Sequence, residues 1–398
     1  MKILKNITVF TMVMLLSVST VLEAREKNIS NFSSSASNLV DSTGTFDGNK
    51  IYADVANNGL FLDYHVSGDS ALEWPKGTGV HSIFQSALWM GATVNGSIRT
   101  IVGDYTQDMG PGPWGGDPLA AVHRIYKVEK SMLASPLDFA DFQEWPVEFG
   151  APWVDVDGDG VYTPLPGGTD HPEFLGDQVL WFVSNDGDPA YKLNFGTSPM
   201  NVEIQTTMFG FDRPDVFGDM VFLKQLVINK GSDDLVDTYM GLWSDPDLGY
   251  AGDDFVGCDV ALGMGYVWND GDDSQYSTLD IGTPAAGYDF FQGPMVPCED
   301  GDSEEVCPTE GAKMFGTRHP GMKNLKMSSF AFYINGDATY TDPSDETEGY
   351  FYLQGLRKDG SAYPAEIAGD LYDQRFCFYG DPNDSAGHST ANPVDGNY

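Results

Sequence analysis

Residues Ala151–Pro164 read APWVDVDGDGVYTP, and we take the rest of the chain as organised around this stretch. Asp155, Asp157 and Asp159 stand at positions 1, 3 and 5 of a short loop, and a glycine follows at position 6. Ca²⁺ takes roughly six to eight oxygen ligands, and carboxylates at these positions supply the first half of such a shell. Val161 would add its backbone carbonyl at position 7. The pattern therefore predicts a calcium-binding loop and a fold that calcium stabilises.

This loop differs from an EF-hand, because Pro166 stands where the EF-hand has its bidentate glutamate. Prolines and glycines on both sides disfavour flanking helices, so we expect a loop between strands or coil. A later acid would close the shell; Asp170 is our choice, with Glu173 and Asp177 as alternatives. An ordinary acidic surface turn is the competing interpretation. We favour the cation because crowded aspartates repel one another unless a cation lies among them.

A second acidic cluster follows Trp243. Asp245 and Asp247 form an Asp-x-Asp pair at the end of an expected strand, and Asp253 and Asp254 follow closely. These four carboxylates could complete another oxygen cage for Ca²⁺, or they could form an acidic loop on a solvated surface. They are also the candidates for the acid and base of a secreted polysaccharide-degrading enzyme.

Other catalytic signatures are absent from the sequence. It contains no Gly-x-Ser-x-Gly elbow, no His-Glu-x-x-His helix and no phosphate-binding Gly-Lys-Ser/Thr loop. No Cys-x-x-Cys pair points to zinc. We therefore name no catalytic residue and favour a binding or structural role over an enzyme. Trp114, inside a Gly/Pro-rich loop, is the aromatic side chain that we expect at the surface, where a sugar ring could stack on it.

The N-terminus has the pattern of a secretory signal peptide. Lys2 and Lys5 precede an apolar, uncharged run over residues 7–21, and Ala24 offers a small residue for cleavage. The run is short for a membrane-spanning anchor, which is the competing interpretation, and no later segment is long and apolar enough to span a bilayer. We expect cleavage of residues 1–24 and a secreted or cell-surface protein.

The composition limits the class of partner. Asp and Glu number 59 against 21 Lys and Arg, which gives a formal net charge of −38. Such a surface repels phosphate backbones, so nucleic acid is excluded as a favoured partner. It suits an extracellular protein that gathers divalent cations and binds a glycan or a surface protein. A surface that is acidic without any specific partner is the competing interpretation.

The sequence contains four cysteines. Cys298 and Cys307 enclose a short acidic loop, and we expect them to form a local disulfide in an exported protein. Cys258 and Cys377 could pair or could be free buried thiols, and the sequence leaves both possibilities open.

Segments rich in Val, Ile, Phe and Tyr alternate with Gly/Asp/Asn/Pro turns, which predicts a mostly β fold of one or two sandwich-like units. The expected strands cover residues 83–94, 97–104, 179–184, 202–211, 219–230, 238–244, 256–268, 326–335 and 349–355, and Asn95-Gly96 is a hairpin turn. Residues 136–145 are the best helix candidate. The expected regions are a signal peptide (1–24), a flexible leader (25–45), an N-terminal β-rich region (46–150), the calcium loop region (151–177), a sandwich-like domain (178–360), and a tail or the start of a truncated domain (361–398).

Several stretches of the sequence resemble a group of known proteins. They include LEWPKGTG (72–79), EWPVEFGAPWVDVDGDGVYTP (144–164) and GLWSDPDLGYAGDDFVGCD (241–259). They resemble uncharacterised secreted β-rich proteins of bacteria that have the type IX secretion system, over residues 57–375. The resemblance implies export and gives no activity. Members of this group usually carry further β-sandwich modules and a C-terminal sorting domain. We find no such domain before Tyr398 and expect either a shortened member of the group or a fragment.

Overall fold

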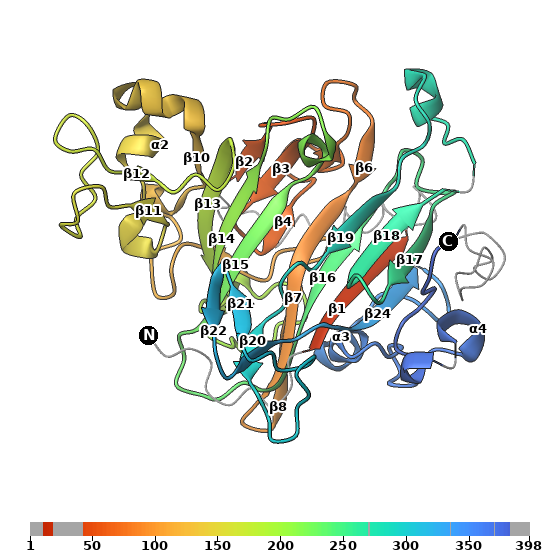
Figure 1. Cartoon of the computed structure of the whole chain (residues 1–398). Helices are drawn as coiled ribbons and strands as arrows, with labels where there is room; N and C mark the ends of the chain where they lie inside the picture. The colour runs from red at the N-terminus through yellow and green to blue at the C-terminus, as the bar shows by residue number, and fades with distance from the viewer. Residues whose placement is uncertain (1–10, 19–42, 270, 335, 370, 383–398) are drawn as a thin grey trace. The chain divides into compact units, whose positions relative to one another are not determined.

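The computed structural model describes residues 11–18, 43–269, 271–334, 336–369 and 371–382 (Figure 1). The chain forms two compact units, each built from separate segments. The first unit consists mainly of residues 32–86 and 103–232, and the second of residues 4–31, 87–102 and 233–398. Strands in mostly antiparallel ladders dominate both units, so the mostly β prediction is confirmed. Among the described residues, no helix has the length and apolar character needed to cross a membrane.

The main sheet of the first unit has the strand order β10-β13-β14-β15, with β9 beside β13 (Figure 1). All of its ladders are antiparallel. Its strands are β9 (Gly110–Pro111), β10 (Tyr126–Glu129), β13 (Gln178–Asn185), β14 (Val202–Gly210) and β15 (Phe222–Asn229). The strands predicted at 179–184, 202–211 and 219–230 are confirmed. Strand β13 is buried along its whole length, as expected for an apolar strand between two neighbours.

The remaining strands of the first unit form a sheet of order β2-β3-β5-β6 and a short β11-β12 ladder. They are β2 (Thr43–Phe46), β3 (Tyr52–Ala56), β5 (Leu72–Glu73), β6 (His81–Ile83), β11 (Trp153–Val154) and β12 (His171–Pro172), while the short strand β4 (Leu60–Leu62) belongs to neither of these sheets. The helical elements are short: η1 (Ala121–His123), η2 (Lys130–Ala134), η3 (Pro136–Asp138), α2 (Ala140–Gln143), η4 (Val147–Phe149), η5 (Pro189–Tyr191) and η6 (Val216–Asp219). The helix expected at 136–145 is thus two separate turns, η3 and α2.

The second unit has a sheet of order β24-β1-β16-β7, with β8 beside β7. Its strands are β1 (Thr11–Val18), β7 (Gln85–Val94), β8 (Ser97–Ile101), β16 (Val236–Asp245) and β24 (Met327–Ile334). Strand β1 runs parallel to both β16 and β24, and it falls inside the predicted signal peptide. The rest of that peptide and the expected leader up to residue 42 lie outside the described residues, and cleavage after Ala24 stays a prediction.

Asn95 and Gly96 form the predicted hairpin turn between β7 and β8. Val94 pairs with Ser97, and both turn residues have positive φ angles, of 52° and 82°. A two-residue turn with two positive φ angles favours Asn-Gly, because asparagine tolerates this conformation and glycine adopts it without a steric cost.

Two strand predictions in the second unit are wrong. Residues 256–268 form a hairpin, β17 (Phe255–Asp259) and β18 (Met264–Trp268), rather than one strand. The Asp259 side chain accepts a hydrogen bond from the Leu262 N–H, and Gly263 has a φ of 73°, so the local turn interrupts the apolar pattern.

Residues 349–355 belong mostly to a helix, α3 (Glu346–Leu353), rather than to an edge strand. Asp345 accepts hydrogen bonds from the Thr347 and Glu348 N–H groups at the helix start. The first N–H groups of a helix have no partner within the helix, and the Asp345 side chain accepts hydrogen bonds from two of them. This cap stabilises the helix and outweighs the β propensity of the aromatic residues that follow.

The other elements of the second unit are β19 (Ala286–Asp289), β20 (Met295–Pro297), β21 (Ala312–Met314), β22 (Thr317–His319), β23 (Met322–Asn324), η7 (Tyr276–Leu279), α4 (Ala365–Ala368) and η8 (Leu371–Gln374). Phe376 and Phe378, in the stretch expected to be a tail or a truncated domain, are buried, and Phe376 bridges to Phe330 of β24.

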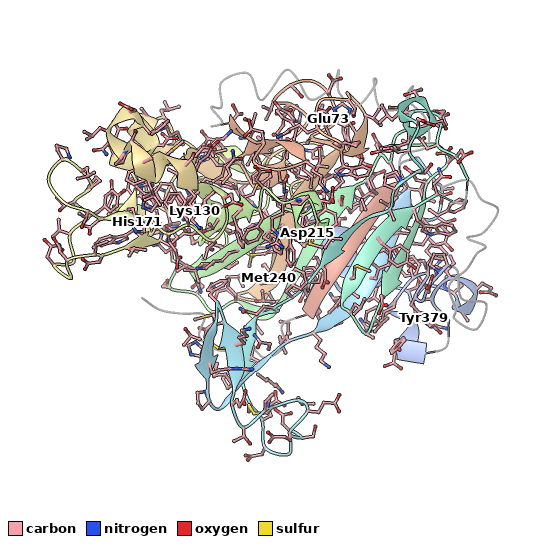
Figure 2. All side chains as sticks on the ribbon, turned by 45° about the horizontal axis from the view of Figure 1, so that its top comes forward. Glu73, Lys130, His171, Asp215, Met240 and Tyr379 are labelled. Carbon is pink, nitrogen blue, oxygen red and sulfur yellow. A yellow bond between two sulfur atoms is a disulfide. The ribbon has the colours of Figure 1, made fainter. Side chains whose placement is uncertain are left out.

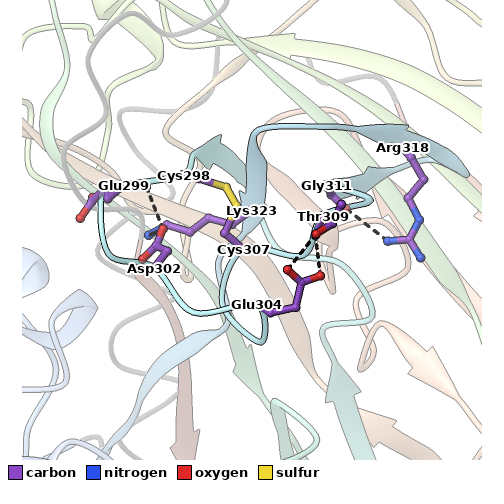
Figure 3. Close-up of a disulfide and its surroundings, with 9 residues drawn as sticks. All are labelled: Cys298, Glu299, Asp302, Glu304, Cys307, Thr309, Gly311, Arg318 and Lys323. Carbon is purple, nitrogen blue, oxygen red and sulfur yellow. Dashed lines mark hydrogen bonds and ion pairs between the residues drawn. A yellow bond between two sulfur atoms is a disulfide. The ribbon is translucent and has the colours of Figure 1, made fainter.

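Cys298 and Cys307 form the predicted disulfide (Figure 3). The loop that they close is also held by charge, because Lys323 donates a hydrogen bond of 2.8 Å to Asp302. Cys258 and Cys377 are both buried and free, so of the two possibilities left open by the sequence the structure has the free thiols. Burial raises the pKa of both thiols, which keeps them protonated and unreactive.

The core of the second unit contains a stack of large rings. Trp89 of β7 stacks on Trp243 of β16 with ring centroids 5.8 Å apart. The Trp243 indole N–H donates a hydrogen bond of 2.6 Å to the hydroxyl of Tyr333 on β24. All three side chains are fully buried, so this hydrogen bond joins two strands where water cannot replace a lost partner.

Replacing Tyr333 by Phe should destabilise this unit. The substitution keeps the ring but leaves the buried Trp243 N–H without this acceptor, at a cost of about 1–3 kcal/mol in the free energy of unfolding. Urea unfolding of the two proteins measures the difference. Tyr250→Phe, at a half-exposed ring, is the control and should change stability little. Equal stability of Tyr333→Phe and the wild type would contradict the role assigned to this bond.

Candidate metal centre

Two short strands hold the ends of the predicted calcium loop together. Val154 of β11 pairs with His171 of β12, which Figure 2 labels, so Asp155 and Asp170 leave the ladder at the same end. Trp153 packs edge-on against Tyr162 with ring centroids 5.5 Å apart, and both rings contact the buried core around Tyr126, Trp145 and Trp181. The Tyr162 hydroxyl donates a hydrogen bond of 2.6 Å to the Phe142 carbonyl. The loop is therefore fixed at its base while its tip is exposed.

This base brings four carboxylates together. Ligand oxygens of Asp155, Asp157, Asp159 and Asp170 all lie within 4.8 Å of one another. In the described part of the chain, this is the single place where three or more acidic, histidine or cysteine side chains converge so closely. Asp170, one of the three closing acids considered, joins the group, whereas Glu173 and Asp177 do not.

Backbone N–H groups orient the loop carboxylates. Asp155 accepts hydrogen bonds from Gly158 and Gly160, of 2.7 and 2.9 Å. Gly160 has a φ of 78°, the conformation for which a glycine was expected at position 6. Asp159 accepts a hydrogen bond from the N–H of Val161, whose carbonyl accepts one from the Thr163 hydroxyl. Ligation by the Val161 carbonyl stays a prediction.

Asp170 differs from the other three aspartates because its side chain is buried, with an exposed fraction of 2%. Its two oxygens accept hydrogen bonds from the N–H groups of Val156 and Thr163, at 2.9 and 2.8 Å. Two backbone donors therefore fix the position of this carboxylate. Asp170 therefore joins the start of the loop to its end and lies beneath the exposed aspartates.

The charges of the loop repel one another. The hydrogen bond from the Asp159 N–H lowers the pKa of Asp157, but partial desolvation and the negative charges of the other three aspartates together raise that pKa above its ordinary value. A divalent cation among the four would replace this repulsion by attraction.

The geometry and chemistry of the group are those expected of a site for a hard divalent cation, and Ca²⁺ itself stays a prediction. Calcium–oxygen distances are about 2.3–2.6 Å, so two oxygens on opposite sides of one ion lie up to about 5 Å apart. The spread of 4.8 Å among the four aspartates falls within this limit. An all-carboxylate set is typical of hard cations such as calcium and lacks the nitrogen or sulfur ligands of a zinc site. The four side chains would hold the ion, and its charge would fix the loop.

The second acidic cluster has a different character. Asp245, Asp247 and Asp254 are buried, and Asp253 is partly buried. Asp254 accepts a hydrogen bond of 2.9 Å from the Leu248 N–H through one oxygen, while its other oxygen is buried without a hydrogen-bond partner. The surface-loop alternative therefore does not describe it. Cation binding here stays a prediction, because the four do not converge as closely as the first group.

Burial raises the pKa of Asp254 to about 9, with the negative charges of Asp247, Asp253 and Asp273 adding to the effect. Without a cation, this carboxyl is therefore protonated at neutral pH. Asp273 is a buried acid that our sequence reasoning missed. It accepts hydrogen bonds from the N–H groups of Tyr250, Gln275 and Tyr276, and so holds the loop after β16 in place. The sequence did contain a signal for Asp273, because this residue stands in an acidic turn.

Two shallow depressions lie on the first unit. The larger, of about 470 Å³, is lined by Glu203, Gln205 and the turn around Phe149. The smaller, of about 290 Å³, is lined by Trp114, Asn185 and Asp188. Trp114 is 41% exposed, as expected, and its indole N–H donates a hydrogen bond of 3.1 Å to Asn201. Its ring is therefore held in place with one part open to solvent.

Comparisons with known proteins give no relative for this chain. No family model matches the sequence, no curated protein matches it, and no solved structure matches the fold. The case for a function therefore depends on the residues and their geometry.

Asp254→Asn should weaken the pH dependence of stability in metal-free buffer. The pKa of Asp254 is about 9 in the folded protein and near the ordinary value of 3.8 in the unfolded chain. At a pH between these two values, the folded protein keeps a proton on Asp254 that the unfolded chain has released. Its contribution to stability is therefore complete below pH 4 and is lost as the pH rises towards and through 9. Asparagine removes this contribution, which amounts to at most about 1.4 kcal/mol per pH unit.

Urea unfolding in EDTA at pH 6 and pH 9 measures the effect. Between pH 6 and pH 9, the wild type should lose more stability than Asp254→Asn. Asp300→Asn changes an exposed acid and should lose as much stability as the wild type. Identical losses in all three proteins would contradict a protonated Asp254.

Proposed function

We propose that this protein is a secreted or cell-surface structural or adhesive protein that calcium stabilises. The observation that carries the proposal is the convergence of four aspartates on a loop with a fixed base. Extracellular calcium is abundant enough to saturate weak sites, so exported proteins can use such loops as structural supports. The strong acidity of the chain favours the same environment.

The predicted signal peptide and the resemblance to proteins exported by the type IX system support export. The ligand in this proposal is an extracellular glycan or a surface protein. The half-exposed Trp114, held beside Asn185 and Asp188, favours a glycan, because a sugar ring can stack on an aromatic face while polar groups bind its hydroxyls.

Calcium should raise the thermal stability of the protein, and EDTA should lower it. A ligand that binds only the folded state adds about 2.7 kcal/mol at a concentration 100-fold above its Kd. For a unit of this size, that corresponds to several degrees in Tm. Differential scanning calorimetry of the full chain, first in calcium and then in excess EDTA, measures the shift.

Asp157→Ala should abolish the calcium-dependent shift, because it removes a ligand from the exposed side of the group and leaves the buried Asp170 in place. Asp69→Ala changes an exposed acid of the same unit outside the loop, and should keep the full shift. A Tm of the wild type that does not respond to calcium or EDTA would refute the structural role of calcium. Equal responses in Asp157→Ala and the wild type would place the ion elsewhere.

A further inference from the structure

Lys192 lies buried in the first unit with two carboxylates beside it. Its Nζ is 2.9 Å from an oxygen of Asp108 and 3.9 Å from an oxygen of Asp186. The side chains of all three residues are at most 1% exposed. Lysine is among the residues that are least often fully buried, so this cluster calls for an explanation.

Local backbone contacts hold the three side chains in position. Asp186 follows β13 and accepts hydrogen bonds of 2.7 Å from the N–H groups of Met200 and Val202. Asp108 also accepts a weak hydrogen bond of 3.4 Å from the Asn194 N–H. The reacting groups therefore come from separate segments of the chain but lie in a fixed arrangement.

The cluster is shielded from water. Met109 and Tyr191, which precede or follow members of the cluster in the sequence, are buried, and so is Met200, whose N–H donates to Asp186. Placing one ammonium and two carboxylates here costs desolvation energy that their mutual attraction offsets only in part. In such surroundings a proton can pass from the ammonium to a carboxylate, because a neutral amine and a neutral acid cost less to bury than two ions.

We propose that Lys192 and Asp108 become joined by an intramolecular isopeptide bond. The neutral Nζ attacks Cγ of the protonated Asp108 carboxyl, the Nζ–Cγ bond forms, and the Cγ–O bond to the hydroxyl breaks. In the starting ion pair, Nζ carries three hydrogens. One of them stays on the amide nitrogen of the product, and two leave with one oxygen of Asp108 as water. No electrons are gained or lost, so the step needs no oxidant, reductant or co-reactant.

Asp186 is the proton carrier of this step. It takes a proton from Nζ as the bond forms and passes it to the oxygen that leaves, so it ends unchanged. Burial raises the pKa of Asp186, and the negative charge of Asp108 adds to this, against the opposing effects of Lys192 and of two backbone hydrogen bonds. Fixed proximity lowers the activation barrier, because a held amine and acid react far faster than free ones.

Intact-mass spectrometry of the full chain, denatured and reduced, tests the bond. The expected mass is lower than the sequence mass by one water molecule. A tryptic digest should contain residues 100–124 joined to residues 131–224, because trypsin does not cleave after an acylated Lys192. The full sequence mass, together with cleavage after Lys192, would overturn the proposal.

Substitutions assign the roles. Lys192→Arg and Asp108→Ala should restore the full mass calculated for each variant. Lys230→Arg is the matched control: Lys230 lies 3.2 Å from Glu203 but is 34% exposed, and its loss should leave the mass deficit unchanged. Asp186→Asn should slow the loss of water after refolding, and circular dichroism would check that it folds. An Asp186→Asn protein that folds and links as fast as the wild type would overturn the role of Asp186.

Discussion

Repulsion among four aspartates that cannot move apart is the constraint on which the account depends. The β11–β12 ladder fixes both ends of the loop, and the rings of Trp153 and Tyr162 pack on the core beneath it. Asp170 is held from below by two backbone N–H groups. The carboxylates therefore stay close together at a cost that a divalent cation would reverse.

The same problem of excess negative charge has other solutions elsewhere in the chain. Asp254 is surrounded by acids in the second unit, and its raised pKa keeps it neutral. Asp108 and Asp186 share a buried lysine in the first unit. Asp273 and Asp345 use their charge to accept backbone hydrogen bonds at turns and at a helix start. Protonation, pairing and capping, together with the cation binding that we propose, are thus ways in which one acidic sequence can form a folded protein.

Much of the fold could be predicted from local patterns. The apolar runs that became β13, β14, β15, β16 and β24, and the Asn95-Gly96 turn, depend on short-range chemistry that the sequence displays directly. Helix α3 was missed because its aromatic residues favour strand, and the decisive cap lies just before them at Asp345. The proximity of Asp170 to the loop aspartates could be predicted because the loop is local, while its role as a ligand stays a prediction. The grouping of Asp108, Asp186 and Lys192 could not be predicted, because it depends on segments that only the folded sheet brings together.

The most direct test of the central claim is calcium binding measured by isothermal titration calorimetry on the full chain and on Asp157→Ala. The account predicts a binding event in the wild type that the substitution removes. Indistinguishable titrations of the two proteins would contradict it, and the four aspartates would then be an acidic turn held by the backbone alone.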